Sequence, residues 1–175
     1  MRPLVTTVVL GGARSGKSSF AEHLVSASGL DRVFLATATG GDAEMRDRIA
    51  HHRAARGGEW YTIEEPLALV DALARESNPR CAVVVDCLTL WLSNLMHADR
   101  NIDAETRRLA DYLPQAPGPM ILVSNEVGLG LVPETPLGRR FRDAQGRLNQ
   151  IVAAAAPAVV FLAAGLPLWL KHPER

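Results

Sequence analysis

The residues best suited to chemistry lie near the start of the chain, where glycines surround a lysine. They match the pattern G-x-x-x-x-G-K-[ST] at every fixed position and read Gly11-Gly12-Ala13-Arg14-Ser15-Gly16-Lys17-Ser18. Glycines let the backbone amides of such a loop point at phosphate oxygens, and the helix that follows adds positive potential. Lys17 would then reach the β- and γ-phosphates, and the Ser18 hydroxyl would ligate Mg²⁺. A chance match is the alternative, but an apolar run precedes the pattern and an amphipathic stretch follows it, as a phosphate loop requires.

A phosphate loop also needs an acidic residue at the end of another strand to hold the metal, directly or through water. Asp86 ends the apolar run of residues 81–86 and supplies that carboxylate. Asp is also common as the N-cap of a helix, and a helix is predicted to start at Leu88. Because the phosphate loop is present, the metal role is the favoured interpretation. The sequence therefore predicts a site for a nucleoside triphosphate with Mg²⁺.

A second cluster lies in residues 42–57, where two adjacent histidines stand among four arginines, Arg46, Arg48, Arg53 and Arg56. At helical spacing His52 shares a face with Ile49, whereas His51 points away from that stripe. Guanidinium groups bind phosphate through two parallel hydrogen bonds and keep a nearby imidazole neutral. Such an imidazole could attack phosphorus and form a covalent intermediate. The alternative is an ordinary solvated helix face with alternating charges.

Short branched apolar runs alternate with longer helical patterns along the whole chain, which predicts an open parallel sheet flanked by helices in one α/β domain over residues 1–175. Strands are predicted at residues 5–10, 33–36, 82–85, 120–124 and 158–162. Helices are predicted at residues 17–28, 43–57, 67–76, 88–97, 104–113 and 137–156. The glycine-rich loops 37–42 and 125–136 each follow a strand, where open α/β sheets bind their ligands.

Composition excludes several classes of protein. The chain has 175 residues, with 47% hydrophobic and 22% charged residues, which is a globular composition. Basic and acidic residues balance at 19 each, which disfavours nucleic acid or an anionic membrane surface as a partner. Residues 151–170 carry no charge, but Pro157, Gly165 and Pro167 interrupt them, so a helix end, a turn and a buried strand are predicted rather than a membrane span. Two cysteines at a spacing of six fit no disulfide or zinc framework, which favours a soluble, cytoplasmic protein.

Several further segments accompany the phosphate loop and carry a family resemblance. They are Arg48-Ile49-Ala50-His51-His52-Arg53, Trp60 with Glu64, Ser124-Asn125-Glu126-Val127-Gly128-Leu129-Gly130-Leu131-Val132-Pro133-Glu134, Phe141-Arg142-Asp143 and Gly146-Arg147-Leu148-Asn149-Gln150. With these segments in this order, the chain resembles the bifunctional adenosylcobinamide kinase / adenosylcobinamide-phosphate guanylyltransferase family over nearly its whole length. The segment with the paired histidines and the Asn-Glu-Val-Gly loop are more specific to that family than the phosphate loop.

The resemblance implies a RecA-like phosphate-loop enzyme of cobalamin biosynthesis that assembles as a homotrimer with sites at subunit boundaries. It implies phosphorylation of adenosylcobinamide by ATP or GTP, then transfer of GMP from GTP to the product through a histidine, here His51. The implied nucleotide contacts are Gly11, Gly12, Ala13, Arg14, Ser15, Gly16, Lys17, Ser18, Ala36, Thr37, Ala38, Arg53, Ala54, Ala55, Arg56, Glu64 and Asp86. Family members can carry Glu at the last position, so the shorter Asp86 leaves room for a water between carboxylate and Mg²⁺.

Three other functions remain open at this point. A small-molecule kinase would use the same Lys17, Ser18 and Asp86 without needing His51. A regulatory GTPase would carry Asn-Lys-x-Asp after a strand, where this chain has Asn-Glu-Val-Gly from Asn125. A RecA-like motor on nucleic acid is disfavoured by the zero net charge.

Overall fold

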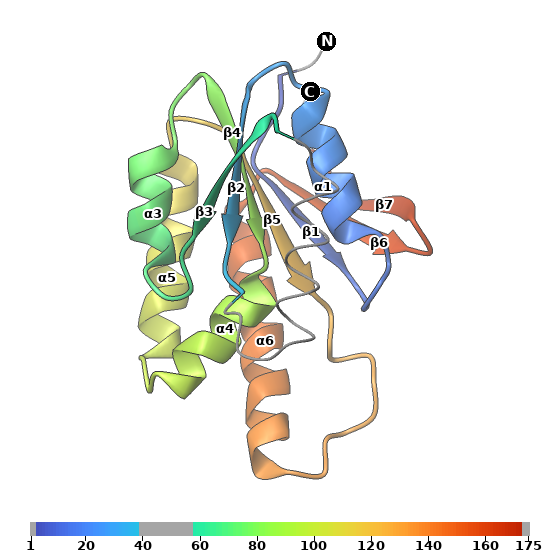
Figure 1. The fold of residues 1–175 in the computed structure, drawn as a ribbon. Coiled ribbons are helices and arrows are strands. Elements are labelled where there is room, and N and C mark those ends of the chain that lie inside the picture. Colours follow the sequence, from blue (N-terminus) through green and yellow to red (C-terminus); the bar gives the residue numbers. More distant parts are fainter. Residues whose placement is uncertain (1–2, 39–57, 173–175) are drawn as a thin grey trace.

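The computed structural model describes residues 3–38 and 58–172. At its centre is a seven-stranded sheet in the order β3-β2-β4-β5-β1-β6-β7 (Figure 1). The strands are β1 (Thr7–Gly11), β2 (Asp31–Ala36), β3 (Trp60–Glu64), β4 (Cys81–Asp86), β5 (Met120–Asn125), β6 (Ala158–Ala163) and β7 (Leu166–Lys171). Neighbouring strands from β3 to β6 are parallel, and β7 alone runs antiparallel, to β6.

Helices cover both faces of the sheet in the described part of the chain. They are α1 (Lys17–Ser26), α3 (Leu69–Glu76), α4 (Leu88–His97), α5 (Ile102–Tyr112) and α6 (Pro136–Ala155), with a short 3₁₀ turn, η1 (Leu113–Gln115). Helix α1 packs on one face, against β1, β4 and β5, while α3, α5 and α6 lie on the opposite face (Figure 1). Helix α4 lies across the ends of β2 and β4, close to where the predicted ligand loops begin (Figure 1).

The central strands are apolar without interruption because both of their faces are buried. In β4, Val83 and Val85 belong to the core beneath α3, α4, α5 and α6, whereas Ala82 and Val84 belong to the core beneath α1. Successive side chains of a strand point to opposite faces, so each strand contributes to both cores. This confirms the parallel α/β sheet predicted from the branched apolar runs.

All five predicted strands are present, and two more were not predicted. Strand β3 is an edge strand with partly exposed side chains, and β7 carries Pro167, which suits an edge strand because proline donates no ladder hydrogen bond. Ala164 and Gly165 join β6 to β7 with φ of 51° and 79°, the positive values that a two-residue hairpin turn requires. The uncharged segment before Lys171 is therefore a helix end and two strands, and no helix in the described ranges is long and apolar enough to cross a bilayer. The predicted helix at residues 43–57 lies outside the described residues.

Candidate nucleotide site

The phosphate loop connects β1 to α1 and depends on two of its glycines. Gly11 has φ of 153°, and a Cβ there would lie 2.5 Å from the Leu162 carbonyl oxygen and 2.7 Å from Ser15 Oγ. Gly16 has φ of 97°, in the region that favours glycine, and a Cβ there would lie 3.3 Å from Gly165 Cα. The Gly165 amide donates to the Ser15 carbonyl oxygen at 2.9 Å. The turn between β6 and β7 thus contacts the phosphate loop and stabilises its conformation.

Lys17 is buried beneath this loop. Its ammonium group donates to the Gly12 carbonyl oxygen. Burial lowers the pKa of Lys17, and the nearby Cys87 and Asp86 partly offset that effect. The carboxylate of Asp86, at the end of β4, is one of the groups whose charge acts on this ammonium. The Cys87 thiol is neutral there, because burial raises its pKa to about 11.

Three predicted nucleotide contacts lie in one row across the sheet. Ala36 of β2 pairs with Glu64 of β3 on one side and with Asp86 of β4 on the other. Residues in register on parallel strands point to the same face, and two positions before Asp86 the Val84 side chain is in the core beneath α1. The Asp86 carboxylate therefore points to the face of the sheet on which α1 begins with Lys17 and Ser18.

Thr37 follows β2 and is completely buried. Its hydroxyl donates to the Cys87 carbonyl oxygen at 2.7 Å and accepts from the Cys87 amide at 2.9 Å. Its own amide donates to the Asp86 carbonyl oxygen at 3.2 Å, and its carbonyl oxygen accepts from Asn94 at 2.7 Å. These bonds engage the amide, the hydroxyl and the carbonyl oxygen of Thr37 within the protein. In this structure Thr37 positions the end of β4, which carries Asp86.

The residues beside the phosphate loop fit Mg²⁺. The ion prefers hard oxygen ligands and takes only one or two from protein, the others coming from phosphates and water. Ser18 and Asp86 offer a hydroxyl and a carboxylate on the same side of the sheet. Ser15 Oγ is buried and has no hydrogen-bond partner among the described residues, so a polar atom in the loop remains available for a ligand. Mg²⁺ bound there would neutralise phosphate charge.

Hydrogen bonds that the sequence did not predict fix the end of β5 beside the phosphate loop. The Asn125 amide donates to Thr89 Oγ1 of α4 at 2.8 Å, and its carbonyl oxygen accepts from Asn149 Nδ2 of α6 at 3.1 Å. The Glu126 amide donates to the Gly11 carbonyl oxygen at 3.0 Å. Asn149 belongs to a segment that carries the family resemblance, but nothing in its spacing distinguishes a buried amide from an exposed one. The predicted site residues His51, Arg53, Ala54, Ala55 and Arg56 lie outside the described residues.

Comparisons of the sequence with known proteins agree on one family. Residues 7–170 match the family described as cobinamide kinase / cobinamide phosphate guanyltransferase. The bifunctional adenosylcobalamin biosynthesis protein CobP of Pseudomonas aeruginosa is 50% identical over 94% of this chain and 96% of its own length. The corresponding protein CobU of Escherichia coli is 37% identical over 94% of this chain and 98% of its own length.

Solved structures with low sequence identity share the fold. A Pyrococcus horikoshii protein, PH0250, covers 99% of this chain and 89% of its own at a TM-score of 0.60 and 11% identity. The RadB recombinase covers 91% of this chain and 74% of its own at a TM-score of 0.52 and 17% identity. These similarities bear on architecture alone, and they confirm the RecA-like phosphate-loop fold.

Proposed function

Because the chain belongs to the cobinamide kinase / cobinamide phosphate guanyltransferase family, we propose that it catalyses both reactions named in that description. It phosphorylates the aminopropanol hydroxyl of adenosylcobinamide with ATP or GTP. It then transfers GMP from GTP to the phosphate so formed, through a guanylyl group on His51, and releases pyrophosphate. The observation that carries the proposal is the phosphate loop between β1 and α1, with Asp86 at the end of β4 facing the same side of the sheet as α1.

In the kinase reaction, the phosphate loop binds and orients the triphosphate. The amides between Gly11 and Ser18 surround the phosphates, and the α1 N-terminus adds positive potential. Lys17 leaves the Gly12 carbonyl oxygen and donates to the β- and γ-phosphates, where it offsets the negative charge as the substrate hydroxyl attacks the γ-phosphorus. Ser18 and Asp86 would hold Mg²⁺, which would neutralise charge on the phosphates.

In the guanylyl transfer, His51 attacks the α-phosphorus of GTP, and the bond from this phosphorus to the bridging oxygen of pyrophosphate breaks. The phosphate of adenosylcobinamide phosphate then attacks the same phosphorus, and the histidine leaves. The arginine-rich segment from Arg53 to Arg56, with Ala54 and Ala55, would contact the nucleotide, as would Ala36, Thr37, Ala38 and Glu64 at the ends of β2 and β3. These assignments come from the family resemblance.

Covalent labelling tests the proposal. The protein is incubated with GTP that carries isotope at the α-phosphate and, in parallel, at the γ-phosphate, and is then denatured. We expect acid-labile, base-stable label from the α-phosphate alone, and none in His51→Ala. Absence of α-label in a protein that still phosphorylates adenosylcobinamide would leave a kinase without the histidine step. In that case His51→Ala would have no effect on activity.

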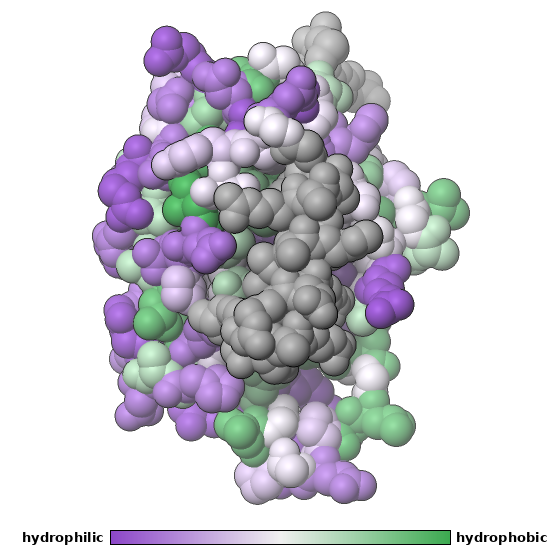
Figure 2. Space-filling model, viewed as in Figure 1, coloured by the Kyte–Doolittle hydropathy of each residue, from purple (hydrophilic) through white to green (hydrophobic). Residues whose placement is uncertain are grey.

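We also propose that the chain forms a homo-oligomer, a trimer by the family resemblance, in the cytoplasm. Exposed aliphatic side chains gather on two neighbouring parts of the surface, the β6–β7 hairpin and the loop between β5 and α6 (Figure 2). Leu166 is 72% exposed and Leu131 is 96% exposed, and apolar patches of this kind commonly mark interfaces. Both cysteines are free thiols, which suits a reducing compartment. Sedimentation velocity of the wild type and of Leu166→Glu measures the oligomeric state, and a monomeric wild type would contradict the oligomer.

A further inference from the structure

A cavity of about 510 Å³ opens where α4 passes the ends of β2 and β3. It lies beyond the carboxyl ends of two strands, the usual position of ligand sites in open parallel sheets. Five of its lining residues follow one another at helical spacing on one face of α4 or at its end. Its lining includes Ala38, which follows β2, and Leu67, Leu90, Ser93, Asn94, His97 and Ala98.

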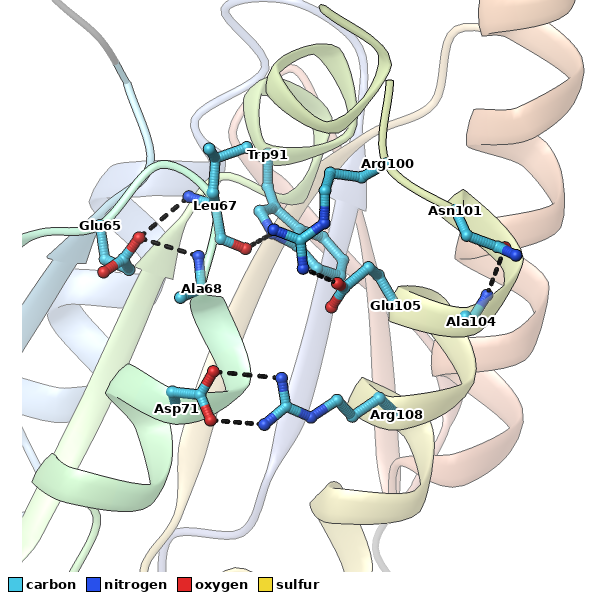
Figure 3. Close-up of polar contacts among 10 residues, drawn as sticks. All are labelled: Glu65, Leu67, Ala68, Asp71, Trp91, Arg100, Asn101, Ala104, Glu105 and Arg108. Atoms are coloured by element: carbon cyan, nitrogen blue, oxygen red, sulfur yellow. Dashed lines mark hydrogen bonds and ion pairs between the residues drawn. The ribbon is translucent and has the colours of Figure 1, made fainter. Parts of the chain in front are cut away.

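The walls of this cavity are held in place by hydrogen bonds within the protein. Glu65 accepts from the amides of Leu67 at 3.1 Å and Ala68 at 2.8 Å, which fixes the turn before α3 (Figure 3). The indole nitrogen of Trp91 donates to the Leu67 carbonyl oxygen at 3.0 Å and ties this turn to α4 (Figure 3). The cavity is therefore formed before any ligand binds, which reduces the entropic cost of binding.

The described lining residues offer both apolar surface and uncharged polar groups. Leu67 and Leu90 contribute apolar surface, and Ser93 contributes a hydroxyl. Both amide hydrogens of Asn94 are used on the carbonyl oxygens of Thr37 and Pro66, so its side-chain oxygen is the atom that remains to accept from a ligand. His97 Nδ1 bonds to the Ser93 carbonyl oxygen at 2.7 Å, so Nε2 is the ring nitrogen that could bond to a ligand. No lysine or arginine is among the described lining residues.

We infer that this cavity binds the rim of the corrin ring of adenosylcobinamide. That rim carries methyl groups and uncharged primary amides, the two kinds of group that this lining complements. A ring of that size cannot enter completely, so only one edge is held. The inference rests on the proposed function and extends it, because it names a surface for the corrinoid.

The position of the cavity suits the reaction. Strands β4 and β5 separate β2 from β1, and three intervals of about 4.8 Å put the end of β2, where the cavity opens, roughly 14 Å across the sheet from the end of β1, where the phosphate loop begins. The aminopropanol arm spans roughly 8 Å when extended, since an extended chain gains about 1.2 Å per bond. The arm and the triphosphate chain together cover the distance, so a corrinoid held here can present its hydroxyl to the γ-phosphate.

A matched pair of substitutions tests this. Ala98→Phe fills the cavity from an exposed position at the end of α4, and Ala104→Phe places the same side chain on exposed α5, outside it. The KM for adenosylcobinamide and for the triphosphate is measured in the kinase reaction, and equilibrium dialysis measures corrinoid binding by its absorbance. We expect Ala98→Phe to raise the corrinoid KM and Kd by at least about tenfold, a loss of about 1.4 kcal/mol, with the triphosphate KM unchanged. Ala104→Phe should behave like the wild type.

Each other outcome overturns the inference. Unchanged corrinoid binding in Ala98→Phe would show that the corrinoid sits elsewhere, and a raised triphosphate KM alone would make the cavity a nucleoside subsite. If Ala98→Phe unfolds, as seen by circular dichroism, Ser93→Leu fills the cavity from a partly buried position and is read in the same way. A wild type that neither binds nor phosphorylates adenosylcobinamide would refute the proposed function itself. A failure confined to Ala98→Phe refutes only the corrinoid surface.

Discussion

Replacing Thr37 with valine tests whether this residue positions the end of β4. Valine has nearly the same shape, so the substitution leaves no cavity but removes the hydroxyl that bonds to Cys87. The Cys87 carbonyl oxygen keeps a second donor, the Trp91 amide at 3.1 Å. The buried Cys87 amide loses the acceptor that it has in this structure. The main cost is therefore one unsatisfied buried donor.

An unsatisfied buried donor costs about 1–3 kcal/mol of folding free energy. For a chain of this size, each kcal/mol lowers the melting temperature by roughly 2–4 °C. We therefore expect Thr37→Val to lower the free energy of unfolding by about 2 kcal/mol and the melting temperature by roughly 4–8 °C. Urea unfolding followed by circular dichroism, together with a thermal scan, measures both quantities.

Thr37→Ser is the matched control. It keeps the hydroxyl and removes one buried methyl group, which costs about 1 kcal/mol. The serine variant should retain kinase activity, whereas the valine variant should lose it in part because Asp86 is no longer held in place. A valine variant as stable as the wild type, or more stable than the serine variant, would refute the hydrogen-bonding role of Thr37.

Three further predictions concern other parts of the molecule. Gly11→Ala should raise the Kd for a fluorescent triphosphate by at least about tenfold, because its Cβ would lie 2.5 Å from the Leu162 carbonyl oxygen; unchanged binding in this variant would contradict the loop geometry. Burial raises the pKa of Cys87 to about 11, so the thiol should resist Ellman's reagent at pH 8 until the protein is unfolded. Its contribution to the free energy of unfolding should be complete below pH 9 and be lost as pH rises through 11. Urea unfolding of wild type and Cys87→Ala at several pH values measures this contribution. The hydrogen bond from Arg108 lowers the pKa of Asp71, so the ionised carboxylate stabilises the fold at neutral pH and this contribution is lost as pH falls through the lowered pKa. The difference in melting temperature between wild type and Asp71→Asn should therefore be largest at neutral pH, vanish in acid and shrink in high salt, as thermal scans would detect.

The parts of the site that sequence reasoning predicted depend on local patterns. A phosphate loop needs glycines, a lysine and a hydroxyl at fixed spacing, so eight consecutive residues specify its shape. Asp86 was predicted because a carboxylate that ends a fully apolar strand needs a partner, and in the structure its charge acts on Lys17. The five predicted strands were found for the related reason that burial on both faces requires unbroken apolar runs.

The parts that were missed depend on contacts between distant segments. Strand β3 is short and partly exposed, and although Trp60, Tyr61 and Ile63 favour a strand, the chain pattern around them does not indicate that they pair with β2. Strand β7 depends on a turn in which Ala164 has a positive φ, a conformation that the residue type disfavours. Thr37 and Asn94 are 57 positions apart in the chain and meet only because α4 crosses the end of β2. No spacing rule could indicate that hydrogen bond.

Thr37 connects the two halves of the proposed site. On one side its amide and hydroxyl hold the Asp86–Cys87 segment, which faces the phosphate loop. On the other side its carbonyl oxygen binds Asn94, a lining residue of the cavity. If both surfaces serve one reaction, Thr37→Val should raise the KM for the triphosphate and for adenosylcobinamide together, whereas Ala98→Phe should raise only the second. If the cavity is unrelated to catalysis, both variants should leave the corrinoid KM unchanged. The two variants together therefore show whether the phosphate loop and the cavity serve one reaction or are adjacent but unrelated.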